Sequence, residues 1–418
     1  MEVKPGYKQT EVGLIPEDWN VTTIGSVAET SSGTTPSRAL AERYYRNGHI
    51  SWVKTLDLNN SEIKVTEERV TQAALGETSL KCYPSGSVVV AMYGGFNQIG
   101  RTGLLRIPAT VNQALTAIRP YPSRLCPEYL QSVLNLRVDY WKSVASSSRK
   151  DPNITSRDIR DFPLALPMLE EQETIAGVLR DADVLVESLG RLIGKKRSLK
   201  LGVTQSLLTG KKRLPGFSGQ WITRQLGEVM AHCSSGATPF RGRPEYYKGT
   251  VKWITSGELN YNLIGDTIEY ISEEAVEKTN LKVHPVGTFL IAITGLEAAG
   301  TRGACGIVGS PATTNQSCMA IYPSSELRNE YLYHYYVLRG NELALRYCQG
   351  TKQQSYTAKL IRLLPIDLPP SVEEQAAIAA VLSDMDAEIG ALDAELVRTR
   401  QLRQGMMQEL LTGKVRLV

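Results

Sequence analysis

The sequence predicts an α+β chain in which two similar globular domains are separated by two long antiparallel helices that form a coiled coil, with an internal pseudo-two-fold. Three observations predict this fold. Residues 19–214 and 221–418 repeat each other at an offset of 201–203 positions. Within each repeat, short apolar runs bounded by Gly and Pro give way to a long segment with helical spacing. The charges of the two helical segments complement each other only if the helices run in opposite directions.

The repeat consists of short motifs that return in the same order. A period of about 200 residues is too long for a solenoid repeat and matches one domain plus a connector. The chain is therefore a duplicated two-part unit, and a two-fold repeat suggests a two-fold ligand. The paired segments are 31–36 with 234–239, 44–52 with 246–253, 108–113 with 311–316, 170–179 with 373–382, and 205–214 with 408–417.

Composition is typical of a globular protein of the cytoplasm. Charged residues make up 22% of the chain and apolar residues 42%, and no apolar run approaches the roughly 18–20 residues that a membrane span needs. The chain does not open on a signal-peptide pattern. The six cysteines and four histidines do not recur between the repeats, so we expect reduced thiols and no metal site. The net charge of +4 is only weak evidence for a polyanionic partner.

Each repeat begins with a compact α+β domain. Residues 86–92 and 287–293 are short β-branched runs between Gly and Pro, which is typical of buried strands. Helices are expected near residues 129–144 and 331–347. The predicted domain boundaries are 1–167 for the first globular domain, 168–214 for the first helix, 215–370 for the second globular domain and 371–418 for the second helix.

The helical segments carry an apolar stripe at alternating spacings of four and three residues, which predicts a coiled-coil seam. Pro167 and Pro369 precede the helices and a Thr-Gly-Lys sequence follows each of them, so each helix should span about 38 residues. Leu199 and Leu402 are expected to continue the stripe. The seam residues are Ile175, Leu179, Val186, Leu189 and Ile193 in the first helix, and Ile378, Leu382, Ile389, Leu392 and Leu396 in the second.

Charge predicts the direction of packing. The first helix has six acids and one base in residues 170–187, then eight bases and no acid in residues 191–213. The second has seven acids and no base in residues 373–395, then five bases and one acid in residues 398–416. An antiparallel pair places each acidic half beside a basic half. The alternative, that these charges only complement the helix macrodipoles, accounts for the terminal turns but not for residues 386–395.

Four motifs recur in both halves of the chain. They are the Ser-Gly-x-Thr-Pro loop followed by Tyr-Tyr and Trp, Asn-Gln after a Pro-Ala turn, the Leu-Pro and Glu-Glu-Gln helix entry, and the Leu-Leu-Thr-Gly-Lys helix exit. Taken together, these motifs resemble the DNA-specificity subunits of type I restriction-modification systems over essentially the whole chain. Each motif is weak alone, but all occur twice, in order, at one offset.

The resemblance implies a noncatalytic subunit whose two target-recognition domains read a bipartite double-stranded DNA site. It also implies docking of two adenine-N6 methyltransferase subunits, and of nuclease/translocase subunits in the full complex. No cofactor is expected on this chain, because S-adenosylmethionine, ATP and Mg²⁺ would be used by the partner subunits. The sequence agrees, since it has neither an Asp/Asn-Pro-Pro-Tyr/Phe motif nor a phosphate-binding Gly-x-x-x-x-Gly-Lys-Ser/Thr loop.

Candidate DNA contacts lie after the Ser-Gly loops and in the Gly-rich loops that follow the buried strands. Arginine can form two hydrogen bonds with guanine, and the amide of glutamine can form two with adenine. Because the loops at 92–101 and 293–302 differ in sequence, we expect two unlike half-sites. In the first domain the candidates are Thr35, Arg38, Arg43, Arg46, Lys54, Tyr93, Asn97, Gln98, Arg101, Thr102, Arg149 and Lys150. In the second they are Thr238, Arg241, Arg243, Lys252, Thr294, Thr301, Arg302, Lys352, Gln353 and Gln354.

Several alternatives remain at this point. The basic clusters could be solvated faces, and Asn112 and Asn315 could bond strand ends rather than DNA. Val178, Leu185, Leu192, Val381 and Ala391 lie beside the seam, where they could form the methyltransferase-docking surface or simply widen the seam. A stand-alone bivalent nucleic-acid-binding module would have the same domains without such a surface. A nuclease acting alone would need a carboxylate set that the repeat does not contain.

Overall fold

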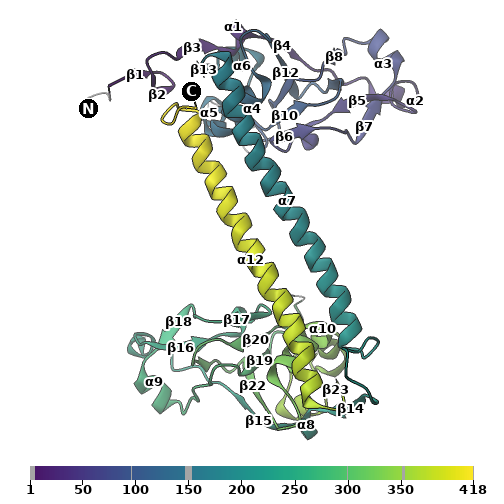
Figure 1. Ribbon diagram of the computed structural model, residues 1–418, viewed down its shortest axis with the longest axis vertical. Helices are drawn as coiled ribbons and strands as arrows, with labels where there is room; N and C mark the ends of the chain where they lie inside the picture. Colours follow the sequence, from purple (N-terminus) through teal and green to yellow (C-terminus); the bar gives the residue numbers. More distant parts are fainter. Residues whose placement is uncertain (1–4, 96, 146–152, 299, 351–353, 418) are drawn as a thin grey trace. The chain divides into compact units, whose positions relative to one another are not determined.

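A computed structural model of the chain describes residues 5–95, 97–145, 153–298, 300–350 and 354–417. The chain divides into two compact units. The first comprises Met1–Gly190 with Glu395–Val418, and the second comprises Arg191–Ala394. Each unit thus contains one globular domain and parts of both long helices, α7 (Leu169–Leu207) and α12 (Val372–Leu410) (Figure 1). No helix in the described part of the chain is long and apolar enough to cross a membrane.

The globular domain of the first unit is built on two mixed sheets. One has the strand order β4-β12-β9-β10-β6 and the other β7-β5-β11-β8. Pairs β10/β6 and β11/β5 are parallel and the remaining pairs are antiparallel. Two-stranded pairs β1-β2 and β13-β3 complete it. The strands are β1 (Tyr7–Thr10), β2 (Gly13–Pro16), β3 (Asn20–Thr23), β4 (Ala28–Ser32), β5 (Ile50–Val53), β6 (Ser61–Ile63), β7 (Glu68–Val70), β8 (Cys82–Tyr83), β9 (Val88–Ala91), β10 (Thr102–Leu105), β11 (Ala109–Val111), β12 (Leu115–Pro120) and β13 (Pro163–Leu166).

The second unit repeats this topology. Its larger sheet has the order β15-β22-β19-β20-β17 with β17/β20 parallel, and its smaller sheet has the order β18-β16-β21 with β16/β21 parallel. Strands β14 and β23 pair in the place of β3 and β13. The strands are β14 (Ile222–Gln225), β15 (Met230–Ser235), β16 (Val251–Ile254), β17 (Asn262–Ile264), β18 (Glu269–Ile271), β19 (Phe289–Ala292), β20 (Cys305–Val308), β21 (Thr313–Thr314), β22 (Cys318–Pro323) and β23 (Pro365–Leu368).

Short helices cover the sheets. In the first unit they are α1 (Ile24–Val27), α2 (Ala41–Tyr44), α3 (Gln72–Glu77), α4 (Pro127–Leu136), α5 (Val138–Ala145) and α6 (Ser156–Arg160), with 3₁₀ turns at Arg38–Leu40 and Thr55–Asp57. In the second unit they are α8 (Leu226–Val229), α9 (Glu273–Lys278), α10 (Asn329–Tyr347) and α11 (Ala358–Arg362), with 3₁₀ turns at Pro244–Tyr247 and Ser256–Glu258.

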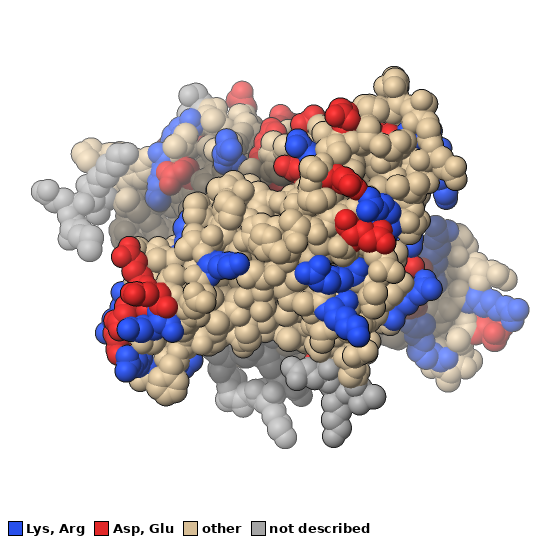
Figure 2. All heavy atoms as spheres, turned by 90° about the horizontal axis from the view of Figure 1, so that it is seen from below, with Lys and Arg blue, Asp and Glu red and all other residues tan. Residues whose placement is uncertain are grey.

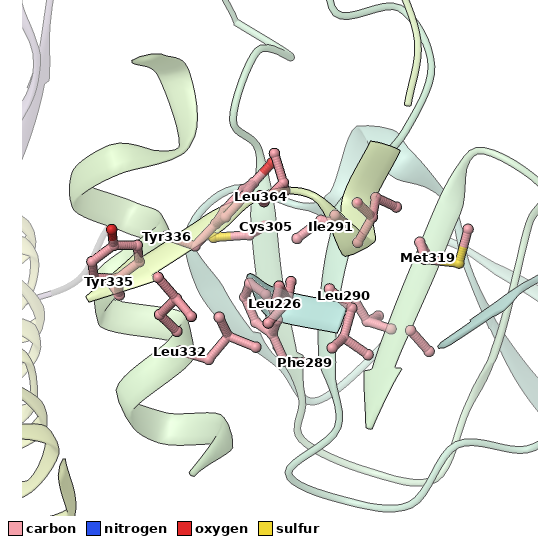
Figure 3. Close-up of a cluster of buried hydrophobic side chains, with 14 of the residues drawn as sticks. Leu226, Phe289, Leu290, Ile291, Cys305, Met319, Leu332, Tyr335, Tyr336 and Leu364 are labelled. Carbon is pink, nitrogen blue, oxygen red and sulfur yellow. The ribbon is translucent and has the colours of Figure 1, made fainter. Parts of the chain in front are cut away.

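The predicted buried strands form the centres of the larger sheets. All four residues of β9 and all four of β19 are buried. In the second unit Phe289 and Ile291 of β19 pack towards the side chains of α10, which include Leu332 and Tyr336 (Figure 3). Trp19, Trp52 and Trp253 are at most 2% exposed, as expected for core anchors, whereas Trp221 is only partly buried.

The helix expected near residues 129–144 is interrupted, whereas its counterpart α10 is continuous. Helix α4 ends at Leu136 and α5 begins at Val138. Arg137 lies between them with φ −100 and ψ 30, and its Nη1 donates to the carbonyl oxygen of Pro163 at 2.8 Å. Its guanidinium also lies 4.9 Å from the ring of Phe162. This partly buried arginine therefore ties the break to β13.

The long helices pack against each other in an antiparallel coiled coil, as predicted. Both have 39 residues. Within each unit, the partner's residue number falls as the number on α7 rises. In the first unit Glu171 pairs with Arg416 and Asp183 with Arg403, and in the second Lys196 pairs with Glu388 and Lys200 with Asp386. Eight of the ten predicted seam residues are buried, and Val186 and Leu392 are partly buried.

The expectation that Leu199 and Leu402 continue the seam is wrong. Their exposed fractions are 55% and 66%. The neighbouring bases Lys200 and Arg403 turn inward instead and pair with Asp386 and Asp183, leaving side-chain exposures of 22% and 26%. An amphipathic base can pack its methylene stem against the partner helix while its charge reaches an acid across the seam. The two ion pairs occupy equivalent positions in the two units.

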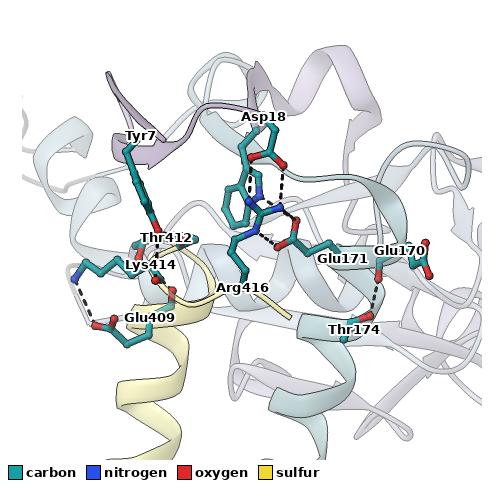
Figure 4. A network of polar contacts seen from close by, with 11 residues as sticks. Tyr7, Asp18, Glu170, Glu171, Thr174, Glu409, Thr412, Lys414 and Arg416 are labelled. Carbon is teal, nitrogen blue, oxygen red and sulfur yellow. Dashed lines mark hydrogen bonds and ion pairs between the residues drawn. The ribbon is translucent and has the colours of Figure 1, made fainter. Parts of the chain in front are cut away.

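The segment after each long helix is joined to the beginning of the other helix by an ion pair with a buried carboxylate, which we call the clasp. In the first unit Arg416 bonds Glu171 at 2.5 Å (Nε to Oε1) and 2.9 Å (Nη2 to Oε2), and the Glu171 side chain is 1% exposed. Trp19 Nε1 donates to the same carboxylate at 3.0 Å. Asp18 accepts two further bonds from Arg416, which holds the pKa of Asp18 below its usual range (Figure 4).

The second unit has the equivalent Arg–Glu pair. Arg213 bonds Glu374 at 2.5 and 2.6 Å, and the Glu374 side chain is again 1% exposed. Here Nη1 donates to the carbonyl oxygen of Gly219, and Nη2 donates to that of Ser218 as well as to Glu374, so no aspartate takes part. The two clasps therefore share the Arg–Glu pair. They differ in how the exposed side of the arginine is satisfied and in the tryptophan, because Trp19 Nε1 donates to Glu171 whereas Trp221 Nε1 has no hydrogen-bond partner in the described part of the chain.

Two buried histidines in the second unit should make its stability depend on pH. His284 contacts Tyr322 Oη (2.6 Å) and Thr314 Oγ1 (3.2 Å), with Lys282 nearby. His334 contacts Ser383 Oγ at 3.0 Å, where Asp386 raises its pKa and Lys200 lowers it. Burial lowers the pKa of both imidazoles to about 4.

Because the folded pKa lies below the ordinary value of about 6.5, the unfolded chain binds more protons between these values. The free energy of unfolding should therefore be fully developed above pH 6.5 and fall as the pH decreases towards 4. Urea unfolding at a series of pH values tests this, and His284→Gln should reduce the slope in that range. A slope that is unchanged in His284→Gln would contradict the assignment of this histidine.

The clasp should be sensitive to the loss of one partner. Arg416→Ala leaves the carboxylate of Glu171 buried without its cation, which costs about 3 kcal/mol of unfolding free energy. Adding Glu171→Gln should recover part of this loss. Arg157→Ala serves as the control, because the pair of Arg157 with Asp161 is exposed (81% and 63%) and should contribute less than about 1 kcal/mol. Equal destabilisation by the Arg416 and Arg157 variants would contradict the clasp.

Candidate nucleic-acid interface

The Ser-Gly-x-Thr-Pro loop of the first unit is held by two aromatic side chains from the Tyr-Tyr and Trp motifs. Trp52 Nε1 donates to the carbonyl oxygen of Thr34 at 3.3 Å, and the Tyr45 hydroxyl donates to the carbonyl oxygen of Pro36 at 2.6 Å. Both aromatic residues precede or lie on β5, so the smaller sheet fixes the loop. The Ser-Gly-x-Thr-Pro, Tyr-Tyr and Trp motifs thus form one hydrogen-bonded arrangement.

The same arrangement recurs in the second unit. Trp253 Nε1 donates to the carbonyl oxygen of Ala237 at 3.1 Å, and the Tyr247 hydroxyl donates to the carbonyl oxygen of Pro239 at 2.5 Å. Donors and acceptors are at equivalent positions in the two units. The repeat therefore preserves the backbone path of this loop, and we call the arrangement the loop clamp.

A glycine is required at the start of each clamped loop. A Cβ at Gly33 would lie 2.1 Å from the carbonyl oxygen of Asn112, and one at Gly236 would lie 1.8 Å from that of Thr314. These backbone atoms belong to the turn of the Asn-Gln motif. The side chain of each Asn, Asn112 or Asn315, accepts from a backbone N–H two residues later. Both asparagine side chains therefore bond the strand end internally.

An arginine covers each clamp. The guanidinium of Arg38 lies 4.1 Å from the ring of Tyr45 and 5.2 Å from that of Trp52, and it pairs with Glu68 at 2.7 Å. Arg241 repeats this arrangement at 4.2 Å from Tyr247 and 5.2 Å from Trp253, paired with Glu269 at 2.7 Å. Stacking and ion pairing hold these two predicted DNA contacts in fixed positions. Their partners Glu68 and Glu269 were missed by the sequence analysis.

The other predicted cations of this region also have partners within the chain. Most pairs are exposed, so they contribute little stability and their bases can exchange a carboxylate for a phosphate. Lys54 and Lys252 are the most buried, with side-chain exposures of 19% and 26%. The partners are Glu77 for Arg43, Glu42 for Arg46, Glu67 and Glu68 for Lys54, the Tyr246 hydroxyl for Arg243, and the Gly265 carbonyl oxygen, Ser310 and Asp266 for Lys252.

The face drawn in Figure 2 shows the same mixture of charges. Basic side chains form small separate groups among uncharged surface, and acidic side chains gather towards the edges of the face (Figure 2).

The two threonine candidates beside the clamps differ in exposure. Thr35 is partly buried, whereas Thr238 is exposed and its hydroxyl donates to the amide oxygen of Gln316.

The loop after β9 contains the remaining described candidates of the first unit. Tyr93 is 44% exposed, Asn97 is exposed and Gln98 is partly buried. Arg101 Nε donates to the carbonyl oxygen of Asn97 at 3.0 Å, which pins the loop onto itself. Thr102 is fully buried in β10, and its hydroxyl donates to Asn135 at 2.7 Å. Its burial in the sheet is contrary to the predicted DNA contact.

The equivalent loop after β19 is pinned in the same manner by different residues. Arg302 donates to the carbonyl oxygens of Leu296 (3.0 Å) and Glu297 (2.8 Å). The Thr301 hydroxyl donates to the carbonyl oxygen of Gly295. Arg101 and Arg302 thus shape their own loops. In this structure their guanidinium groups are engaged with backbone carbonyls.

A second segment joins this loop. Thr294 forms a β-bridge with Ser355, and the backbone N–H of Gln354 donates to Glu297 Oε2 at 3.0 Å. Glu297 is exposed and was missed as a candidate. It lies in the loop at 293–302, which we call, like its counterpart at 92–101, a reading loop. A carboxylate at such a position can accept a hydrogen bond from the amino group of cytosine. Arg149, Lys150, Lys352 and Gln353 lie outside the described residues.

The family model for the type I restriction modification DNA specificity domain matches residues 16–193 and 219–396. The chain belongs to this family of specificity subunits. Each matched range contains one loop clamp, one reading loop and the first part of a long helix. The internal repeat is therefore two copies of a DNA specificity domain.

Relatives of this specificity subunit cover either one repeat or the whole chain. The type I restriction enzyme MjaIX specificity subunit of Methanocaldococcus jannaschii is 31% identical over 187 residues, which is 44% of this chain and 42% of that protein. The first relative is thus matched over less than half of its length. The putative type I restriction enzyme MjaX specificity subunit of the same organism is 23% identical over 98% of this chain and 97% of its own length.

Solved structures share the fold. The S subunit of a type I restriction-modification system from M. genitalium superposes with a TM-score of 0.64 at 14% identity, covering 98% of both chains. A chain from a structure titled as the basis of complex assembly and conformational transition of the type I R-M system gives a TM-score of 0.57 at 18% identity, covering 96% of this chain and 99% of that one. At these identities the likeness concerns the fold alone.

The clamp predicts a position-specific effect of a single methyl group in this specificity subunit. Gly236→Ala places a Cβ against the Thr314 carbonyl and must displace the backbone, so we expect a loss of roughly 1–3 kcal/mol in unfolding free energy and weaker DNA binding. Gly265→Ala is the matched control, because its Cβ would meet nothing within 4 Å. Thermal melting and a DNA-binding titration measure both effects. If the two variants behave alike, the clamp does not hold the loop.

Proposed function

We propose that this specificity subunit reads an asymmetric bipartite site in double-stranded DNA, one part with each globular domain, and docks two adenine-N6 methyltransferase subunits. Nuclease/translocase subunits join the same complex. The chain itself is noncatalytic and binds no cofactor, while S-adenosylmethionine, ATP and Mg²⁺ are used by its partners. Among the described residues, no three His, Cys, Asp or Glu side chains lie in an arrangement that could hold a metal ion.

The observation that carries this proposal is that the two units share equivalent clamps but differ in the loops at 92–101 and 293–302. The hydrogen bonds from Tyr45 and Trp52 recur from Tyr247 and Trp253 on equivalent carbonyls. Beyond the clamps, the loop at 92–101 offers Tyr and two amides, whereas the loop at 293–302 offers threonines and a carboxylate. Because base edges in the major groove are distinguished by their donors and acceptors, unlike loops favour unlike half-sites.

The long helices support the docking part of the proposal. Seam residues bury only one stripe of each helix, and Leu185 and Leu192 of α7 remain 49% and 39% exposed. Exposed apolar side chains along a helix are suited to packing against a partner helix. Two similar domains joined by such helices can approach major-groove segments one helical turn or more apart, roughly 34–36 Å for one turn.

Selection from a randomised duplex pool tests the proposal. The chain is mixed with the methyltransferase from the neighbouring gene, and the bound duplexes are sequenced. We expect a split motif with two different halves at a fixed gap, each half containing an adenine. Unsplit or sequence-independent enrichment would contradict the bipartite reading. Selection of the same split motif without any association of the methyltransferase would instead favour a stand-alone bivalent module.

A further inference from the structure

The two units contain equivalent clefts with opposite chemistry. Each cleft lies between the outer parallel strand of the larger sheet, the helix that covers this sheet, and a long helix: β6, α4 and α7 in the first unit, and β17, α10 and α12 in the second (Figure 1). The sheet registers align them, because Glu62 faces Leu104 in one and Leu263 faces Ile307 in the other. Their volumes are about 230 and 500 Å³.

The cleft of the first unit is lined by charges that satisfy one another. Arg106 bonds Glu62 at 2.6 Å and Glu128 at 2.7 Å, and Lys64 bonds the second oxygen of Glu62 at 2.8 Å. Desolvation opposes ionisation there, but these cations still lower the pKa of Glu62. A partner that entered this cleft would have to replace existing ion pairs.

The cleft of the second unit is apolar, with acids at its border. Leu263 replaces Glu62 and is 67% exposed, and Tyr261 is 43% exposed. The ring of Tyr333 forms part of the wall, held by its hydroxyl, which donates to the Tyr261 carbonyl oxygen at 2.7 Å. Glu330 is exposed at this border, and Asp386 lies across the cleft, paired with Lys200.

The backbone at Tyr261 is strained. Its φ is +56, which equals that of the equivalent Asn60. Asparagine tolerates this left-handed conformation, whereas a bulky side chain there raises the free energy of the folded state. Non-glycine residues held in this region occur preferentially at ligand-binding and other functional sites. A strained, exposed tyrosine beside an exposed leucine is thus a second observation that points to the same cleft.

We propose that the second-unit cleft, formed by Tyr261, Leu263, Ile307, Tyr333, Glu330 and Asp386, is a docking site for a methyltransferase segment that carries a lysine or arginine next to an apolar side chain. The apolar side chain packs on Leu263 and Ile307. The stem of the base lies along the tyrosine rings, and its charge reaches Glu330, with Asp386 kept in its pair with Lys200 on the far side of the cleft. The proposal rests on the proposed function, and it predicts that the methyltransferase copy docked on this unit binds more tightly than the other copy.

The test exchanges the cleft residues for those of the other unit. Tyr261→Asn with Leu263→Glu reproduces Asn60 and Glu62, and Asn suits the left-handed backbone, so the double variant should melt no lower than the wild type. Ile268→Glu is the matched control, because it adds the same charge at an apolar side chain that is 83% exposed outside the cleft. The full chain is titrated with the methyltransferase from the neighbouring gene, and native mass spectrometry follows both binding steps.

We expect the double variant to raise the Kd of the tighter step by about tenfold or more, while the second step, DNA binding and the Ile268→Glu control stay unchanged. A photo-crosslinker at position 263 should capture a methyltransferase segment that contains a base. Unchanged binding by the double variant, an equal effect of the control, or an acidic captured segment would overturn the proposal. A wild-type chain that binds DNA but no methyltransferase would contradict the proposed function itself, and with it the occupant of the cleft.

Discussion

The buried ion pair between the end of one long helix and the start of the other is the constraint on which the architecture depends. Arg416 with Glu171, and Arg213 with Glu374, join segments far apart in the sequence, and each carboxylate side chain is only 1% exposed. A buried carboxylate without its cation strongly destabilises the folded state. The segment after each long helix therefore has to lie beside the start of the other long helix. The sequence repeat and the folded unit therefore differ, because each unit contains pieces of both repeats.

Long-period features were predictable from the sequence because they depend on local spacing. The apolar stripe predicted both 39-residue helices, and the opposite charge gradients predicted their antiparallel packing. The stripe failed at Leu199 and Leu402, where Lys200 and Arg403 enter the seam, since spacing alone does not show which neighbour meets an acid on the other helix. The interruption of the helix at Arg137 likewise depends on a carbonyl contributed by the distant strand β13.

The candidate site was less predictable because its arginines are positioned by distant partners. Arg38 and Arg241 follow the Ser-Gly loops as the sequence indicates, yet their stacking on Tyr and Trp and their pairing with Glu68 and Glu269 become visible only in the fold. Thr102 follows a Gly-rich loop but faces the sheet interior. A sequence pattern thus indicates where the loops lie along the chain, whereas the direction of each side chain depends on packing.

A shared scaffold with different loops and different clefts gives one account of how a duplicated chain acquires unlike halves. Substituting residues 19–167 for residues 221–370 places the same reading loop in both units while it keeps both clasps and both long helices. Selection of DNA by this chimera, in complex with the methyltransferase, tests the account directly. The account predicts a symmetric split motif with two copies of one half-site at the original gap. An asymmetric motif like that of the natural chain would contradict the claim that each unit reads its own half-site.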